Sequence, residues 1–194
     1  MDPHSQELFA HIRVVMGMVV GLSVTRLLSG LARMIQHPKP HHLSAIHLLW
    51  VFSLLVELAL FWWWEFALSQ LPHITFGKFL FLIGYAFALF LLCALLFPDE
   101  LDDYADYEVF FIDRRRWFFS VFALTFVLDT VDTAIKGAEY WSRYSADYLA
   151  QVPIGLTLSA VAFFSSNRRV QLVIVLLHLA YQAYWIARVI TGTD

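Results

Sequence analysis

The chain has 194 residues, of which 60% are hydrophobic and 15% are charged, and its formal net charge at pH 7 is -3. Soluble domains typically have about 45 to 50% apolar and about 25% charged residues, so this composition excludes an ordinary soluble protein. It also excludes a nucleic-acid-binding surface, because the Lys and Arg residues are divided among short polar segments. We therefore expect a polytopic membrane protein that contacts the lipid bilayer.

Six apolar runs follow one another along the chain, and each approaches the length of about 20 residues that crosses a bilayer as a helix. They lack the alternation of barrel strands, and backbone groups in lipid must be satisfied within a segment. The predicted fold is all-α, a single transmembrane helical bundle over residues 1–194. The expected spans are roughly 8–33, 44–69, 76–97, 117–138, 149–166 and 170–190.

The first run carries small residues at four-residue intervals. Gly17, Gly21, Thr25 and Ser29 form the kind of ladder that lets two helix backbones approach closely in lipid. This pattern predicts that the first helix is the packing centre.

The third run has no charge between Phe79 and Phe97, so we expect it at the periphery.

The longest polar connection is 98–116, which is acidic at first and ends in three arginines. We interpret it as a solvated cytoplasmic loop with an arginine anchor. Leu101, Tyr104, Glu108 and Phe111 recur at helical spacing. The alternative is therefore a short amphipathic segment on the membrane interface that docks a partner.

The orientation is predicted from loop cations, because Lys and Arg accumulate on the cytoplasmic side. Their distribution predicts that both termini lie outside the cytoplasm. The arginine-tryptophan start of the fourth run, Arg114 to Phe118, resembles small bacterial inner-membrane proteins, which implies such a membrane but no function. The cations of the loops after the first, third and fifth runs are Arg33, Lys39, Arg114, Arg115, Arg116, Arg168 and Arg169, against Lys78, Lys136, Arg143 and Arg188 on the other side.

Ionisable side chains interrupt four of the runs. At about 100° per residue, Thr125, Asp129 and Asp132 share one face of a helix. A charge at the bilayer centre costs at least about 2.5 to 3.5 kcal/mol, so such groups should face the bundle interior, where they pair or line a wet cavity. The candidates for a proton or cation path are Asp129, Glu57, Asp132, Arg26, His178 and Glu65.

Pairing accounts for only part of this set. Asp132 and Lys136 have the i, i+4 spacing of an ion pair, and Arg26 could neutralise either Asp129 or Glu57. One carboxylate then remains without an obvious cation. A buried acid of this kind tends to keep its proton, a property that suits proton relay or cation exchange.

The histidines allow two interpretations. His178 could extend a proton relay or could simply be hydrogen-bonded on its helix. No second histidine lies at mid-membrane to ligate a haem, and we expect no cofactor. The cluster between the first two runs matches no defined metal site, so it is only a weak metal candidate and is expected to be an interfacial loop. Its members are His37, His41, His42 and His47.

The function is not specified by any catalytic motif. The chain has no glycine-rich phosphate loop, His-Glu-x-x-His pattern, Cys-x-x-Cys pair or nucleophile elbow, so an enzyme is not expected, although a membrane-embedded one stays open. The leading interpretation is a channel or transporter that moves protons or a small cation, with Asp129 and Glu57 as the exchanging carboxylates. The alternative is a non-catalytic subunit or assembly factor that binds other membrane subunits and whose buried charges are structural.

Overall fold

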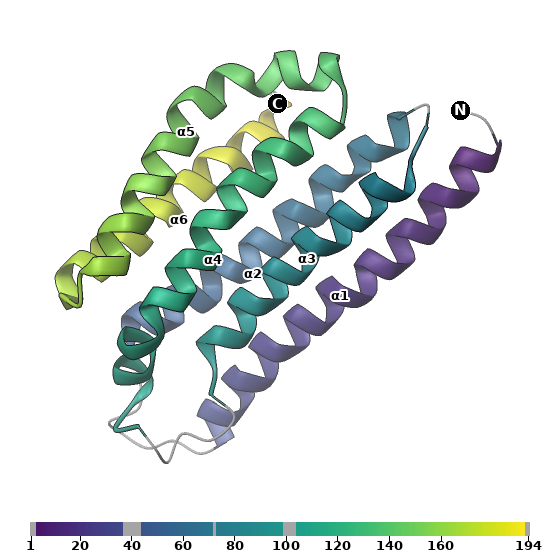
Figure 1. Cartoon of the computed structure of the whole chain (residues 1–194). Helices are drawn as coiled ribbons and strands as arrows, with labels where there is room; N and C mark the ends of the chain where they lie inside the picture. The colour runs from purple at the N-terminus through teal and green to yellow at the C-terminus, as the bar shows by residue number, and fades with distance from the viewer. Residues whose placement is uncertain (1–2, 37–43, 72, 99–103, 193–194) are drawn as a thin grey trace.

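The computed structural model of the chain describes residues 3–36, 44–71, 73–98 and 104–192. This part of the chain is helical and contains no strand, which confirms the predicted all-α bundle (Figure 1). A 3₁₀ helix, η1 (Glu65–Gln70), directly continues α2. The long helices are α1 (Pro3–Gln36), α2 (Ala45–Trp64), α3 (Phe76–Leu96), α4 (Tyr107–Ile135), α5 (Ala138–Phe164) and α6 (Arg168–Thr191).

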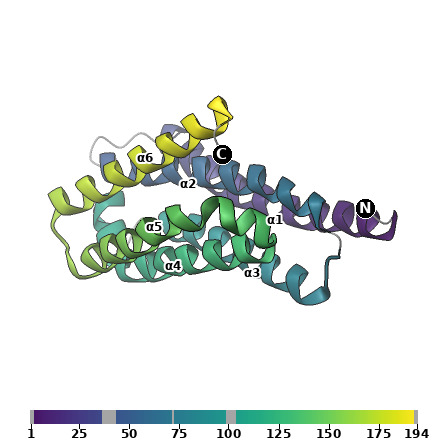
Figure 2. The ribbon, with the colours of Figure 1, turned by 90° about the horizontal axis from the view of Figure 1, so that it is seen from above.

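The helices are arranged in two layers, as Figure 2 shows. Helices α3, α4 and α5 form the front layer of Figure 1, and α2 and α6 form the back layer. Helix α1 flanks both layers, packing against α3 and α2. Both chain ends lie at the same end of the bundle, which we call the terminus end, as an even number of antiparallel helices requires (Figure 1).

Two helices extend well beyond the apolar runs that predicted them. Helix α4 begins at Tyr107 because the carboxylate of Asp106 caps it, accepting a hydrogen bond of 2.8 Å from the backbone N–H of Val109. Residues 107–116 are therefore helical where a loop was expected. Helix α5 begins at Ala138, directly after Gly137, whose φ of 113° lies in a region that favours glycine.

An aromatic core, centred on Trp50, fills the space between the layers in the half of the bundle away from the termini. Trp50 of α2 is fully buried. Its ring centroid lies 5.0 Å from that of Phe118, 5.6 Å from that of Phe119 and 5.1 Å from that of Phe122, all on α4. Edge-to-face contacts of this kind stabilise the packing beyond the area they bury.

The small-residue ladder of α1 is not a packing face within the chain, so the prediction that α1 is the packing centre is wrong. Gly21, Thr25 and Ser29 are exposed, and a Cβ atom added at Gly21 would meet nothing within 4 Å. Only Gly17 approaches another helix, where an added Cβ would lie 3.1 Å from the Trp62 ring. Small residues permit close packing in lipid but do not require it.

Two other glycines lie directly against aromatic rings of neighbouring segments. A Cβ atom at Gly30 of α1 would collide with the ring of Phe97, and one at Gly155 of α5 would collide with the ring of Phe126. Helix α3 is central rather than peripheral, because it packs against α1, α2 and α4. Its lack of charge suits both this apolar packing and the lipid that its exposed face contacts.

Candidate functional site

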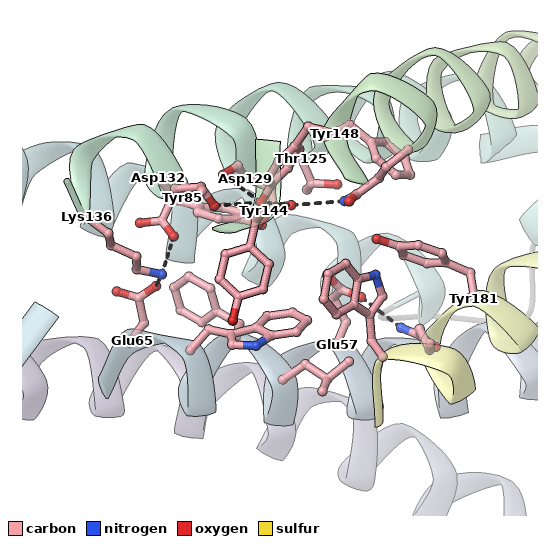
Figure 3. A pocket seen from close by; sticks show the side chains of 18 of the residues that line it. Glu57, Glu65, Tyr85, Thr125, Asp129, Asp132, Lys136, Tyr144, Tyr148 and Tyr181 are labelled. Carbon is pink, nitrogen blue, oxygen red and sulfur yellow. Dashed lines mark hydrogen bonds and ion pairs between the residues drawn. The ribbon is translucent and has the colours of Figure 1, made fainter. Parts of the chain in front are cut away.

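A cavity with a volume of about 60 Å³ lies between the front and back layers, in the half of the bundle nearer the termini (Figure 3). A water molecule needs roughly 10 to 15 Å³ measured in this way, so the cavity has room for a few waters. Helices α2 and α6 form one wall, α4 and α5 form the other, and Tyr85 comes from α3. The polar residues that line it are Glu57, Glu65, Thr125, Asp129, Asp132, Thr133, Lys136, Gln151, His178 and Gln182, together with five tyrosines.

A buried triad, Lys136, Glu65 and Asp132, lies at the terminus end of the cavity. The Lys136 ammonium at the end of α4 donates a hydrogen bond of 3.0 Å to Oε1 of Glu65 in η1. It also donates to Oδ2 of Asp132, one helical turn earlier on α4. The Lys136 ammonium is therefore shared between two carboxyl groups and joins α4 to η1.

The triad has more acceptor atoms than one ammonium serves. Oε2 of Glu65 and Oδ1 of Asp132 are buried and have no hydrogen-bond partner in the protein. Buried oxygens rarely stay without a partner, and the adjoining cavity has room for water. We therefore expect water against these two oxygens.

Asp129 occupies the front wall and is held by neutral donors. Its Oδ2 accepts a hydrogen bond of 3.0 Å from the Tyr148 hydroxyl and one of 3.1 Å from Nε2 of Gln151, both on α5. The Tyr148 hydroxyl also lies 2.6 Å from Oγ1 of Thr133. Within the described ranges, no Lys or Arg side chain forms an ion pair with Asp129.

Glu57 occupies the back wall, and its hydrogen-bond donor is also neutral. Its Oε2 accepts a hydrogen bond of 2.8 Å from Nε2 of Gln182 on α6. Gln182 is itself fixed to α2, since the same amide nitrogen donates to the Ser53 carbonyl at 3.0 Å and its Oε1 accepts from the Ser53 hydroxyl at 3.1 Å. The contacts of Gln182 thus join α2 to α6 and position a donor at Glu57.

His178 lies at the boundary between the cavity and the aromatic core. Its ring stacks on Trp50 with a centroid distance of 5.7 Å and meets Phe122 edge to face at 4.9 Å. Its Nε2 lies 3.9 Å from Oε2 of Glu57, which is too long for a hydrogen bond. This nitrogen is buried and has no hydrogen-bond partner in the protein.

Five of the six residues expected on a proton or cation path line this cavity, and Arg26 does not. The five are Glu57, Glu65, Asp129, Asp132 and His178. Arg26 on α1 instead donates from Nη2 to the carbonyl of Phe97 at 2.8 Å, at the C-terminal end of α3. The expected pairing of Arg26 with Asp129 or Glu57 is therefore not what the structure shows.

Sequence reasoning missed the contribution of α5 to the site. Tyr148 and Gln151 hold Asp129, yet the fifth span was expected to begin at residue 149, which leaves Tyr148 outside it and Gln151 near its start. A signal was present, because Tyr140, Tyr144, Tyr148 and Gln151 recur every three or four residues and so share one face of a helix. Here the tyrosines line the cavity from α5.

The histidine cluster offers no metal site in the described part of the chain. His47 is buried, and its Nε2 lies 2.6 Å from the carbonyl oxygen of Leu96, where it helps to satisfy the end of α3. His37, His41 and His42 lie outside the described residues. Among the residues that are described, no group of three or more His, Cys, Asp and Glu side chains could hold a metal ion.

No protein-family model, curated protein or solved structure matches this chain. The class of protein therefore follows from the fold. All six long helices are long and apolar enough to cross a membrane. Large apolar side chains cover the outer surface, with Leu149 81% and Ile35 78% exposed, as lipid contact requires. The chain is a multi-pass integral membrane protein.

Proposed function

We propose that this protein moves protons or a small cation across the membrane through the cavity, with Asp129 and Glu57 as the exchanging carboxylates. The observation that carries the proposal is the environment of Asp129, which accepts hydrogen bonds from Tyr148 and Gln151 and forms no ion pair with a described Lys or Arg. A carboxyl group in such a place must bind a proton or an external cation to be neutral. The proton or cation that this carboxyl group binds can therefore be exchanged for another.

The two kinds of carboxyl group in the cavity have different roles in this proposal. Glu65 and Asp132 both contact the ammonium of Lys136, and the contact with Glu65 holds the layers together. Glu57 and Asp129 accept hydrogen bonds only from neutral donors and are free to bind and release a proton or a cation. A charge at mid-membrane is energetically costly. Carboxyl groups that lie there without a Lys or Arg partner are therefore candidates for a functional role by default.

The conformation described here supports a transporter more than an open channel. Trp50 and the phenylalanines of α4 close the bundle beyond His178, so the cavity does not continue through the protein. A proton or cation can cross the protein only if the two layers separate around this aromatic core. The hinge or shear motions of packed helices provide a known route for such a change.

The proposed setting is a bacterial inner membrane with both termini outside the cytoplasm, as the loop cations favour. The cavity, which lies toward the terminus end, then lies in the outer half of the membrane. The aromatic core lies in the inner half.

The second candidate function is a non-transporting subunit or assembly factor of a larger membrane complex. It is favoured by the triad of Lys136, Glu65 and Asp132, whose charges lock one layer to the other and do not need to move. In that case Asp129 and Glu57 are also structural. Neutralising them should then affect folding first.

A flux assay separates the two candidates. Purified protein is placed in liposomes that contain a pH-sensitive dye, and a proton or cation gradient is imposed. We expect flux from the parent protein, loss of flux in Asp129→Asn and Glu57→Gln, and normal flux in Asp147→Asn. Asp147 is a matched control because it bonds to Arg188 and does not line the cavity.

Melting temperatures are measured on the same samples. The proposal is overturned if the parent moves neither protons nor common cations. It is equally overturned if Asp129→Asn carries flux at the level of Asp147→Asn.

A further inference from the structure

We infer that the cavity binds a small primary ammonium ion, a positively charged nitrogen with N–H groups on a short alkyl group, rather than an alkali metal ion. This inference rests on the proposed function and deepens it by naming the class of cation. The ligand's N–H groups are assigned to Glu57 and His178, and its alkyl part to the aromatic wall.

The first observation is a pair of neighbouring acceptor atoms that do not bond each other. Oε2 of Glu57 and Nε2 of His178 lie 3.9 Å apart, too far to bond each other. In the tautomer with its proton on Nδ1, His178 presents Nε2 as an acceptor, and this atom is buried without a protein partner. An ammonium nitrogen about 2.9 Å from both atoms lies to one side of the line that joins them and can donate one hydrogen bond to each.

The second observation is the aromatic lining of the cavity. Ten of its 21 lining residues are Phe, Tyr or Trp, and they come from both layers. Ring faces attract cations, most strongly where water is excluded, and ring edges and methyl groups pack well together. Tyr181 of α6 stands beside Glu57 and His178 and presents such a ring to the cavity (Figure 3).

The charge of the cavity also favours a cationic ligand. Four carboxyl groups line it, from Glu57, Glu65, Asp129 and Asp132, and its lining contains one ammonium, that of Lys136. Lys136 forms ion pairs with Glu65 and Asp132. Glu57 and Asp129, on opposite walls, are left to balance the charge of a ligand (Figure 3).

A bare metal ion fits this lining less well. Hard cations are bound by shells of about six or more oxygen atoms at fixed short distances. No group of three or more potential ligand side chains is arranged for a metal in the described residues. The hydroxyls of Tyr148 and Thr133 already bond to each other and, through Tyr148, to Asp129. An organic ammonium needs only a few acceptors and an apolar surround.

The size of the cavity limits the ligand to a few heavy atoms. Its volume of about 60 Å³ is enough for a few waters, and a methylammonium-sized ion displaces about that number. The binding of methylammonium is measured by isothermal titration calorimetry on the purified full chain in detergent, at constant ionic strength with sodium as the background cation. Tetramethylammonium, which has no N–H group, is the comparison ligand.

Three variants test the two parts of the site. His178→Phe keeps an aromatic ring against Trp50 but removes the acceptor, and we expect it to weaken methylammonium about tenfold with little effect on tetramethylammonium. Tyr181→Leu removes a ring face and should weaken both ligands about tenfold, whereas Tyr181→Phe should bind as the parent does. Melting temperatures identify any variant that fails to fold, and Trp64→Leu then replaces Tyr181→Leu as the ring-deletion test.

The outcomes separate this inference from the proposed function. Binding of methylammonium without any flux supports the site and overturns transport. The inference is overturned if methylammonium gives no heat of binding and does not compete with the transported ion. If the parent still moves protons or sodium and Asp129→Asn abolishes this flux, the transport proposal stands. Equal affinity of the parent for methylammonium and tetramethylammonium also overturns it.

Discussion

The Lys136 ammonium donates a hydrogen bond of 3.0 Å to Oε1 of Glu65, and this bond crosses from the front layer to the back layer. Asp132 shares the same ammonium from one turn earlier on α4. All three side chains are buried. The cavity therefore ends, on the terminus side, in a polar contact that connects its two walls.

Replacing Lys136 by Met should strongly destabilise the bundle. The change leaves two buried carboxyl groups without their cation, and removing one partner of a buried ion pair costs about 3 to 5 kcal/mol in soluble proteins. Thermal unfolding in detergent measures the effect. Neutralising all three residues together, as Glu65→Gln, Asp132→Asn and Lys136→Met, should recover much of the loss. If the Lys136→Met variant melts with the parent, the triad does not stabilise the fold.

Alanine at Gly30 or Gly155 should destabilise the protein, whereas alanine at Gly21 should not. Glycine to alanine inside a helix normally stabilises it by about 1 kcal/mol. At Gly30 and Gly155 the added Cβ would collide with the rings of Phe97 and Phe126, while at Gly21 it meets nothing within 4 Å. The melting temperatures of the three variants show whether each substitution stabilises or destabilises the protein. A rise at all three positions would contradict the helix packing described here.

Replacing Arg26 by Leu should lower stability without specifically affecting flux. The substitution removes the hydrogen bond to the Phe97 carbonyl at the end of α3, and an unsatisfied buried acceptor costs about 1 to 3 kcal/mol. Flux is normalised to the amount of folded protein in the liposomes. A loss of normalised flux as large as that of Asp129→Asn would show that Arg26 acts on the cavity after all.

The termini should lie on the same side of the membrane, opposite the α3–α4 connection. Both ends of the described chain lie at one end of the bundle (Figure 1). Reporter fusions at Asp194 and after Asp103 should therefore report opposite compartments, with the fusion at Asp194 outside the cytoplasm. The same compartment for both fusions would remove the six-span arrangement.

Hydropathy predicts the helices better than it predicts their ends or partners. Six apolar runs identify six helices, but α4 and α5 continue into polar residues, so their starts at Tyr107 and Ala138 depend on the Asp106 cap and the Gly137 turn. Helical periodicity places Asp129 and Asp132 on one face. The i, i+4 spacing also predicts that Asp132 pairs with Lys136, as it does in the structure. It does not predict the neutral donors of Asp129, because these come from α5.

Partners that are distant along the chain are the hardest to predict. Arg26 bonds to Phe97 and Gln182 bonds to Ser53 and Glu57, and nothing local in the sequence encodes these pairs. The ladder around Gly21 has the residues of a packing face but remains exposed. Small side chains on a membrane helix allow another helix to pack closely against it, but the arrangement of the other helices decides whether one does.

Access of water to the carboxylate of Asp129 is the condition on which transport and ligand binding both depend. Thr125 lies one turn from Asp129 on α4 and lines the same cavity. The only cysteine in the chain, Cys93, is buried and can be replaced by Ala to provide a background for labelling. A cysteine introduced at Thr125 then reports whether water reaches this wall.

The direct measurement is the reaction rate of Thr125→Cys with a small, water-soluble methanethiosulfonate reagent at neutral pH. Leu92→Cys, at a buried position on α3 that does not line the cavity, gives the rate for a dry site, and Glu139→Cys, at an exposed position on α5, gives the rate for an open one. We predict that Thr125→Cys reacts much faster than Leu92→Cys and more slowly than Glu139→Cys. A rate for Thr125→Cys no higher than that for Leu92→Cys would contradict a hydrated cavity at Asp129.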